Sequence, residues 1–260
     1  MTRTLRTGAS GMAAQQLNVD VIANNIANVN TTGFKRQRVN FQDLFYETRE
    51  APGTKASDQG RNPTGTQVGN GVRVSSTPRI FTQGNLEITG VETDVAIEGD
   101  GFFEVQLPDG SVAYTRAGDF RPDVNGNLVT PQGYLLQPQI TIPDNASQVS
   151  ISTTGIVTVL VDNAQTDIGQ ITLSRFRNPS GLLGLGRNLY QETESSGAPQ
   201  QGVAATPGYG IIRGGALEKG NVEVVNELVN MIVAQRAYEM NSKSVRTGDE
   251  MLQTANDIRR

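Results

Sequence analysis

Residues 220–258, GNVEVVNELVNMIVAQRAYEMNSKSVRTGDEMLQTANDI, form a proline-free stretch in which apolar side chains recur at alternating steps of four and three. This spacing predicts an amphipathic α-helix, with Asn221 as its N-cap. The stripe consists of Val224, Leu228, Met231, Gln235, Tyr238, Ser242, Val245, Asp249, Leu252 and Asn256, and it is widened at its start by Val225, Val229 and Ile232. At 1.5 Å per residue such a helix is roughly 55 Å long, so it needs a partner that covers its apolar side.

The N-terminal segment offers that partner. A second helix is predicted over about residues 2–28, with the same four-three spacing at Leu5, Ala9, Met12, Gln16, Val19, Ala23 and Ile26. Both stripes contain polar residues at seam positions, so neither favours a strong coiled coil by itself. Weak seams of this kind are suited to lateral packing among many helices.

The middle of the chain differs in composition from its two ends. All eleven prolines lie between Pro52 and Pro207, and twenty-four of the twenty-nine glycines lie between residues 39 and 218. Residues 1–38 carry a net charge of +4, and residues 219–260 carry equal numbers of basic and acidic groups. Residues 39–218 therefore carry a net charge of −8. An acidic middle argues against nucleic-acid binding.

The sequence also excludes several other classes of protein. It has no apolar run of eighteen residues that would predict a membrane span, and its start lacks the apolar core of a secretory signal. Because the chain contains no cysteine, disulfides and thiolate chemistry are excluded.

Residues 73–215 show the pattern of a β-rich body. Turn sequences such as Asn125-Gly126 and Thr154-Gly155 separate short candidate strands at 93–97, 102–107, 112–116, 127–130, 139–142, 148–152, 156–161 and 170–176. Many short strands with glycine and proline turns favour a sandwich or an irregular barrel. The predicted fold is therefore α+β, with a mostly β body on a stalk of paired N- and C-terminal helices. Its expected parts are residues 1–38, 39–72, 73–215 and 216–260, the last pairing with residues 1–30.

Catalysis is not expected. The chain lacks histidine and cysteine, which removes the commonest general base and the usual transition-metal ligands. An acidic group formed by Asp94, Glu98, Asp100 and Glu104 resembles a paired-carboxylate site, but Glu104 should point opposite Phe103 and Val105, toward solvent. We expect no catalytic residue, cofactor or metal.

An asparagine-rich stretch, ANNIANVNTTGFK, follows the first helix at residues 23–35. Asn24, Asn25, Asn28 and Asn30 exceed what one helix cap requires, and their amides could bond to backbone groups of neighbouring chains. The simpler interpretation is a C-terminal cap in which Gly33 takes a positive φ.

This stretch resembles the N-terminal signature of the bacterial flagellar rod and hook family, and VNELVNMIVAQRAYEMNSKSVRTGDEML resembles the closing helix of that family. In length and in its middle, the chain is most similar to the members that build the distal rod. The resemblance implies a structural subunit that polymerises into a rigid helical tube, with the terminal helices lining its core. This tube is expected to transmit torque to the hook and to form the export channel.

The polymerisation interface is expected at the seam positions and the asparagine-rich turn. Its residues are Leu5, Met12, Val19, Asn24, Asn25, Ile26, Asn28, Gly33, Phe34, Val224, Leu228, Met231, Gln235, Tyr238, Val245 and Leu252. The partners implied by the resemblance are further copies of the chain, proximal rod proteins, the hook protein, the rings in the peptidoglycan and outer membrane, and the flagellar type III export apparatus. The implied location is the periplasm-spanning rod, reached without a cleaved signal peptide.

Residues 39–72 connect the first helix to the body. Val39, Phe41, Leu44 and Phe45 are expected to be buried against the root of the helices. Residues 46–70 by themselves indicate a long loop, either a flexible linker or a functional segment. The resemblance implies instead that they stiffen the tube through contacts between subunits, and Tyr46, Arg49 and Arg61 are the candidates in it.

Two alternatives remain at the level of the sequence. One is a hook or proximal rod subunit of the same family. The other, of a different class, is a monomeric surface-binding β domain whose helices pair within one molecule.

Overall fold

The computed structural model describes residues 2–53, 55–57, 60–61, 63–162 and 164–258. The chain divides into two compact units. The first contains Met1–Ile26, Gln37–Pro78 and Val224–Arg260, and the second contains Ala27–Arg36 and Arg79–Glu223. The first unit therefore combines both terminal helices with the connecting stretch, and the second is the β body.

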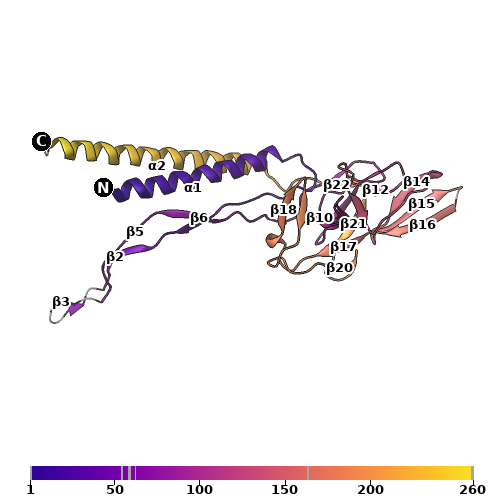
Figure 1. Cartoon of the computed structure of the whole chain (residues 1–260), viewed down its shortest axis with the longest axis horizontal. Helices are drawn as coiled ribbons and strands as arrows, with labels where there is room; N and C mark the ends of the chain where they lie inside the picture. Colours follow the sequence, from indigo (N-terminus) through magenta and orange to yellow (C-terminus); the bar gives the residue numbers. More distant parts are fainter. Residues whose placement is uncertain (1, 54, 58–59, 62, 163, 259–260) are drawn as a thin grey trace. The chain divides into compact units, whose positions relative to one another are not determined.

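Two long helices dominate the first unit. Helix α1 spans Thr2–Ala27 and helix α2 spans Val224–Ile258, and they lie side by side with both chain ends at the same end of the pair (Figure 1). Their contacts confirm an antiparallel arrangement, because Gly8 lies against Val245 and Gly11 against Asn241. The α+β class and the paired terminal helices are as predicted.

Small residues lie at the centre of the contact between the helices. A Cβ atom added to Gly8 would lie 2.6 Å from Val245 Cγ2, and one added to Gly248 would lie 3.3 Å from Leu5 Cδ2. Ala14 and Ala234 are buried on the same helices. The closest packing between the two helices thus involves residues that are offset by one position from several members of the predicted stripes. Five of those predicted members are exposed: Ala9, Gln16, Ala23, Gln235 and Asp249. Backbones approach most closely where side chains are small, and a search for large apolar residues overlooks those positions.

The connecting stretch forms an antiparallel β-ribbon, which corrects the expectation of a loop over residues 46–70. Strand β1 (Asn40–Asp43) pairs with β6 (Val72–Ser76), β2 (Tyr46–Glu50) with β5 (Thr66–Gly69), and β3 (Lys55–Ser57) with β4 (Gly60–Arg61). Glycines and polar residues interrupt the alternation that would otherwise have indicated strands. The ribbon is held to α1, since the Val72 amide donates to Ser10 Oγ at 3.3 Å and Arg3 pairs with Glu47.

Burial along the ribbon also differs from expectation. Val39 is buried and Leu44 is half-buried, but Phe41 and Phe45 are 42% and 92% exposed. The prediction that these two aromatic side chains are buried was wrong. All five residues of β2 are exposed.

The body is built on a seven-stranded sheet. Its order is β11-β12-β13-β9-β10-β19-β18, with bounds β11 Arg121–Pro122, β12 Leu128–Val129, β13 Leu135–Gln137, β9 Phe103–Gln106, β10 Val112–Thr115, β19 Leu189–Gln191 and β18 Leu183–Gly186. Along β9, Phe103 and Val105 are fully buried while Glu104 is not, which confirms the predicted direction of Glu104.

Smaller sheets complete the body around a main apolar core and a second, mostly aromatic cluster. A three-stranded sheet contains β14 (Ala146–Ile151), β15 (Ile156–Val161) and β16 (Ala164–Gln170). Three pairs are β7 (Leu86–Ile88) with β22 (Ala216–Glu218), β8 (Val95–Glu98) with β21 (Ile211–Gly214), and β17 (Thr172–Arg175) with β20 (Gln200–Val203). A short 3-10 helix spans Pro179–Gly181. Side chains from several sheets of the body, among them Phe103, Val157 and Ile212, meet in the main core.

Most predicted strands lie within two or three residues of an observed one, but residues 139–142 do not form a strand. Only an isolated bridge joins Asn127 and Thr141 there, and Pro138 and Pro143, which lack an amide hydrogen, flank the segment. The glycines of the predicted turns at Gly126 and Gly155 adopt φ values of +79° and +82°, as such turns require.

A buried carboxylate joins the two chain segments at which the body begins and ends. Glu218 Oε1 accepts hydrogen bonds from Lys35 Nζ and the Gly84 amide at 2.7 Å each, and Glu218 Oε2 accepts from Arg116 Nε at 3.0 Å. The side chains of Lys35, Arg116 and Glu218 are all nearly inaccessible to solvent. Residues 27–36 and strand β22 are thereby fixed in the body by one acidic group.

Burial lowers the pKa of Lys35 to about 8, with a further contribution from Arg116, although Glu218 opposes the shift. The unfolded chain keeps the lysine proton up to about pH 10.4, so between pH 8 and 10 the unfolded state holds more protons and the free energy of unfolding rises with pH. We expect Lys35→Met to lack this rise in urea titrations at pH 7, 8, 9 and 10. The control variant Lys219→Met removes an exposed lysine that is paired with Glu87, and it should retain the rise. If the unfolding free energies of the wild type and Lys35→Met change with pH in parallel, the lowered pKa of Lys35 is not the cause of the rise.

Candidate assembly interface

The start of helix α2 carries a broad exposed apolar face. Val225, Val229, Ile232 and Val233 are 69%, 54%, 57% and 62% exposed, and Val224 and Leu228 are also exposed. Glu227 and Ala234 are the buried positions in these turns. A helix that is apolar on most of its circumference is normally buried, and contiguous exposed apolar surface marks an interaction site. We refer to Val224, Val225, Leu228, Val229, Ile232 and Val233 as the α2 apolar face.

The structure divides the residues predicted for the interface into three groups. Three are buried within their own chain: Asn25, Gly33 and Phe34. Eight are half-buried: Leu5, Met12, Val19, Ile26, Asn28, Met231, Val245 and Leu252. Five are exposed: Asn24, Val224, Leu228, Gln235 and Tyr238. The predicted positions therefore lie partly in the helix pair and partly on its outside, where another molecule has access to them.

The asparagine-rich turn contributes mainly to the fold of its own chain. Asn25 is buried, and its side chain donates to the Gln37 carbonyl and accepts from the Gln37 amide at 2.9 Å each. Gly33 has φ +67°, and an added Cβ would lie 2.5 Å from the Ala117 nitrogen. Its amide donates to the Glu218 carbonyl, and Phe34 is buried beside it in sequence. Of the four asparagines, Asn30 and Asn24 are exposed.

Asn221 has a role that the sequence did not indicate. Because α2 begins at Val224, Asn221 lies outside the helix. Its oxygen accepts from the Arg36 amide at 2.8 Å, and its amide nitrogen donates to the Ile80 and Thr82 carbonyls. The prediction of an N-cap was wrong, since this side chain satisfies backbone groups of the body instead.

The ribbon presents a second exposed surface. Tyr46 and Arg49 are exposed on β2, whereas the side chain of the third candidate, Arg61, lies outside the described part of the chain. Two-stranded ribbons are marginally stable in water. The exposed side chains of β2 are accessible to another molecule.

The acidic residues of the body do not form a shared site. Asp94 pairs with Arg121, Glu98 pairs with Arg213, and Glu104 accepts from Ser174 and Gln201. Within the described ranges, no group of three or more histidine, cysteine, aspartate or glutamate side chains is placed to hold a metal ion. Over the same residues, neither helix has a segment apolar enough to cross a membrane.

Three family models match successive parts of the chain. The model described as "Flagella basal body rod protein" matches residues 5–35. The "Flagellar hook protein FlgE/F/G D1 domain" matches residues 96–159, and the "Flagellar basal body rod FlgEFG protein C-terminal" matches residues 213–258. The first and third cover most of α1 and α2, and the second covers part of the β body.

Relatives extend this similarity to the whole chain. The chain is 51% identical to the flagellar basal-body rod protein FlgG of Borreliella burgdorferi over 264 residues, with all of both chains covered. It is 50% identical to the protein of the same name in Caulobacter vibrioides, with 99% of each covered. A flagellar hook protein, FlgE of Helicobacter mustelae, is 48% identical over 140 residues, which are 53% of this chain and 30% of that protein. The rod proteins match in full length, and the hook protein does not.

Proposed function

The chain belongs to the flagellar basal-body rod and hook family and is a structural subunit of the basal-body rod, and from this premise we propose that it polymerises through the α2 apolar face into the tube of the distal rod. The observation that carries the proposal is the exposure of six large apolar side chains in ten residues of α2. A tube results when head-to-tail contacts between identical subunits do not close into a ring.

The energetics favour cooperative growth over the formation of isolated dimers. Burying a valine, leucine or isoleucine side chain contributes about 1.5–3 kcal/mol, while association of two molecules costs about 4–15 kcal/mol. A few contacts therefore barely offset that cost, and most of the α2 apolar face must be covered at once. A subunit adds stably only where several neighbours are already in place, which is the end of an existing polymer.

The helix pair is suited to this role because it is weak by itself. Small and polar residues occupy much of its contact, and Ala14, Val21, Ile22 and Ala234 are its buried apolar residues in the described part. Helix stability in water comes mainly from burial of an apolar face. We infer that α1 and α2 become fully ordered on assembly, where they line the tube and leave a channel for export.

The same proposal extends to the surroundings of the subunit. Its neighbours are further copies of the chain, a proximal rod protein at one end and the hook protein at the other, with rings of the peptidoglycan and outer membrane around it. The subunit reaches the periplasm-spanning rod through the flagellar type III export apparatus without a cleaved signal peptide. Its role is mechanical, as a rigid tube that transmits torque, and it is not enzymatic.

Electron microscopy of the concentrated protein tests the proposal. We expect straight tubes, together with a sedimentable fraction that increases sharply above a critical concentration. A chain that remains monomeric at all concentrations, with and without preformed rod fragments as seeds, would instead support the monomeric surface-binding domain.

A further inference from the structure

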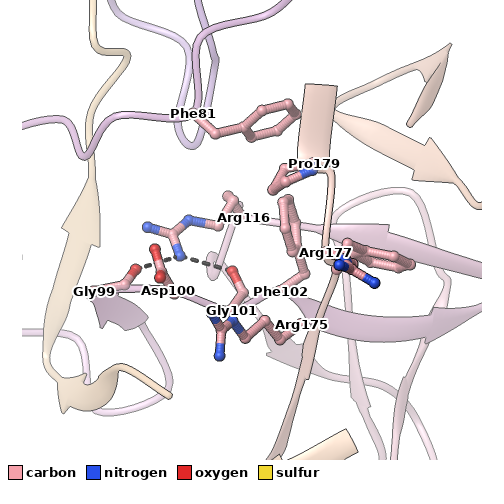
Figure 2. Close-up of a pocket in the computed structure, with 10 residues that line it drawn as sticks. Phe81, Gly99, Asp100, Gly101, Phe102, Arg116, Arg175, Arg177 and Pro179 are labelled. Atoms are coloured by element: carbon pink, nitrogen blue, oxygen red, sulfur yellow. Dashed lines mark hydrogen bonds between the residues drawn. The ribbon is translucent and has the colours of Figure 1, made fainter. Parts of the chain in front are cut away.

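The body contains a pocket whose wall is aromatic. It has a volume of about 170 Å³ and is lined by Phe81, Phe102, Phe176 and Pro179 together with Gly99, Asp100, Gly101 and three arginines (Figure 2). The rings of Phe81 and Phe102 lie 5.4 Å apart, and those of Phe102 and Phe176 lie 5.7 Å apart, both edge to face. An apolar cavity of about 150 Å³ accepts a benzene ring, so this pocket has room for one aromatic side chain.

Positive charge predominates at the pocket. Arg116 uses Nε to bind Glu218 and Nη1 to bind the Gly99 and Gly101 carbonyls, which leaves Nη2 without a bond to any described residue. Arg175 and Arg177 are exposed and make no ion pair with the described residues. Asp100 is the one acidic residue in the lining. The pocket therefore suits an aromatic group that has a carboxylate beside it.

The ribbon of the same chain presents such a group. Phe45 is 92% exposed, yet its backbone is held in place, because its carbonyl accepts from Asn70 Nδ2 at 2.9 Å and the neighbouring Leu44 amide donates to the Gly71 carbonyl at 2.9 Å. Asp43 lies two residues before Phe45, whereas Glu47, two residues after it, is paired with Arg3 of its own chain. An exposed phenylalanine on a held backbone, with the Asp43 carboxylate beside it, is complementary to the pocket in size, in aromatic character and in charge.

We propose that Phe45 of one subunit inserts into the aromatic pocket of a second copy, with Asp43 facing Arg175 and Arg177. This contact rests on the proposed polymerisation and specifies one of its interfaces. It differs from the contact through the α2 apolar face, since it joins the ribbon of one molecule to the body of another.

Cross-linking between two single-cysteine variants tests the contact, because the natural chain has no cysteine. Glu47→Cys and Arg177→Cys leave Phe45, Asp43, Arg175 and the aromatic wall intact. When the two variants are mixed, assembled and treated with a short bis-maleimide, we expect a covalent dimer that contains one copy of each. Replacing Arg177→Cys by Val124→Cys, at a fully exposed site outside the pocket lining, should give no such dimer.

A second pair of variants tests Phe45 itself. Phe45→Ala in the Glu47→Cys chain should reduce the yield of the dimer at least tenfold, whereas Phe41→Ala, also on the ribbon, should leave it unchanged. Sedimentation before cross-linking separates the two proposals. The pocket contact alone is overturned if the polymer forms without a cross-linked dimer, if the dimer survives Phe45→Ala, or if it forms equally with Val124→Cys. If the wild-type chain forms no polymer, both the polymerisation and the pocket contact are overturned.

Discussion

Glu218→Ala is expected to lower the free energy of unfolding of the body by about 3–5 kcal/mol, the cost of removing one member of a buried ion pair. The substitution leaves Lys35 and Arg116 buried close to one another without their shared carboxylate. It also removes the acceptor for the Gly84 amide. Urea unfolding followed through the tyrosines of the body, Tyr114, Tyr134, Tyr190 and Tyr209, measures the loss.

Glu98→Ala is the matched control for this prediction. Glu98 pairs with Arg213 at 2.6 Å, but both side chains are about half exposed. Exposed pairs of this kind contribute less than about 1 kcal/mol. Equal losses for Glu98→Ala and Glu218→Ala would show that the buried carboxylate does not have the organising role assigned to it.

The double variant Val229→Asp, Ile232→Asp is expected to raise the critical concentration for assembly by more than about 100-fold. Two side chains that would be buried at about 1.5–3 kcal/mol each are replaced by charges, and each 1.4 kcal/mol corresponds to a factor of ten. Because both residues are exposed in the single chain, the unfolding free energy of the monomer should change little. Sedimentation across a concentration series measures the critical concentration.

Val124→Asp provides the comparison on the β body. Val124 is fully exposed, in the turn between β11 and β12, and its substitution should leave the critical concentration within a few-fold of the wild-type value. Unchanged assembly of the double variant would remove the α2 apolar face from the interface.

The features predicted correctly from the sequence depend on local patterns. The four-three spacing predicted both helices, because their apolar stripes extend over many turns. Glycines at positions such as Gly126 and Gly155 predicted turns, since the positive φ required there is readily adopted by glycine. The alternation around Phe103 and Val105 likewise indicated a strand with Glu104 on its outer side.

The features that were missed depend on contacts between distant residues. Glu218 is separated from Lys35 by 183 residues and from Arg116 by 102, and no spacing in the sequence indicates that they meet. The helix pair is packed through Gly8, Gly11 and Gly248, which carry no apolar side chain for a periodicity to detect. The exposure of Phe45 was missed because an aromatic residue next to Leu44 normally indicates burial, and here that local signal was misleading.

Amide hydrogen exchange of the monomer and of the assembled polymer tests most directly the claim that the terminal helices complete their burial only on assembly. We expect residues 2–27 and 224–258 to exchange rapidly in the monomer and to become strongly protected in the polymer, while β9 is protected in both and serves as the internal reference. Helices that are as well protected as β9 in the free monomer, with no change on assembly, would contradict the claim.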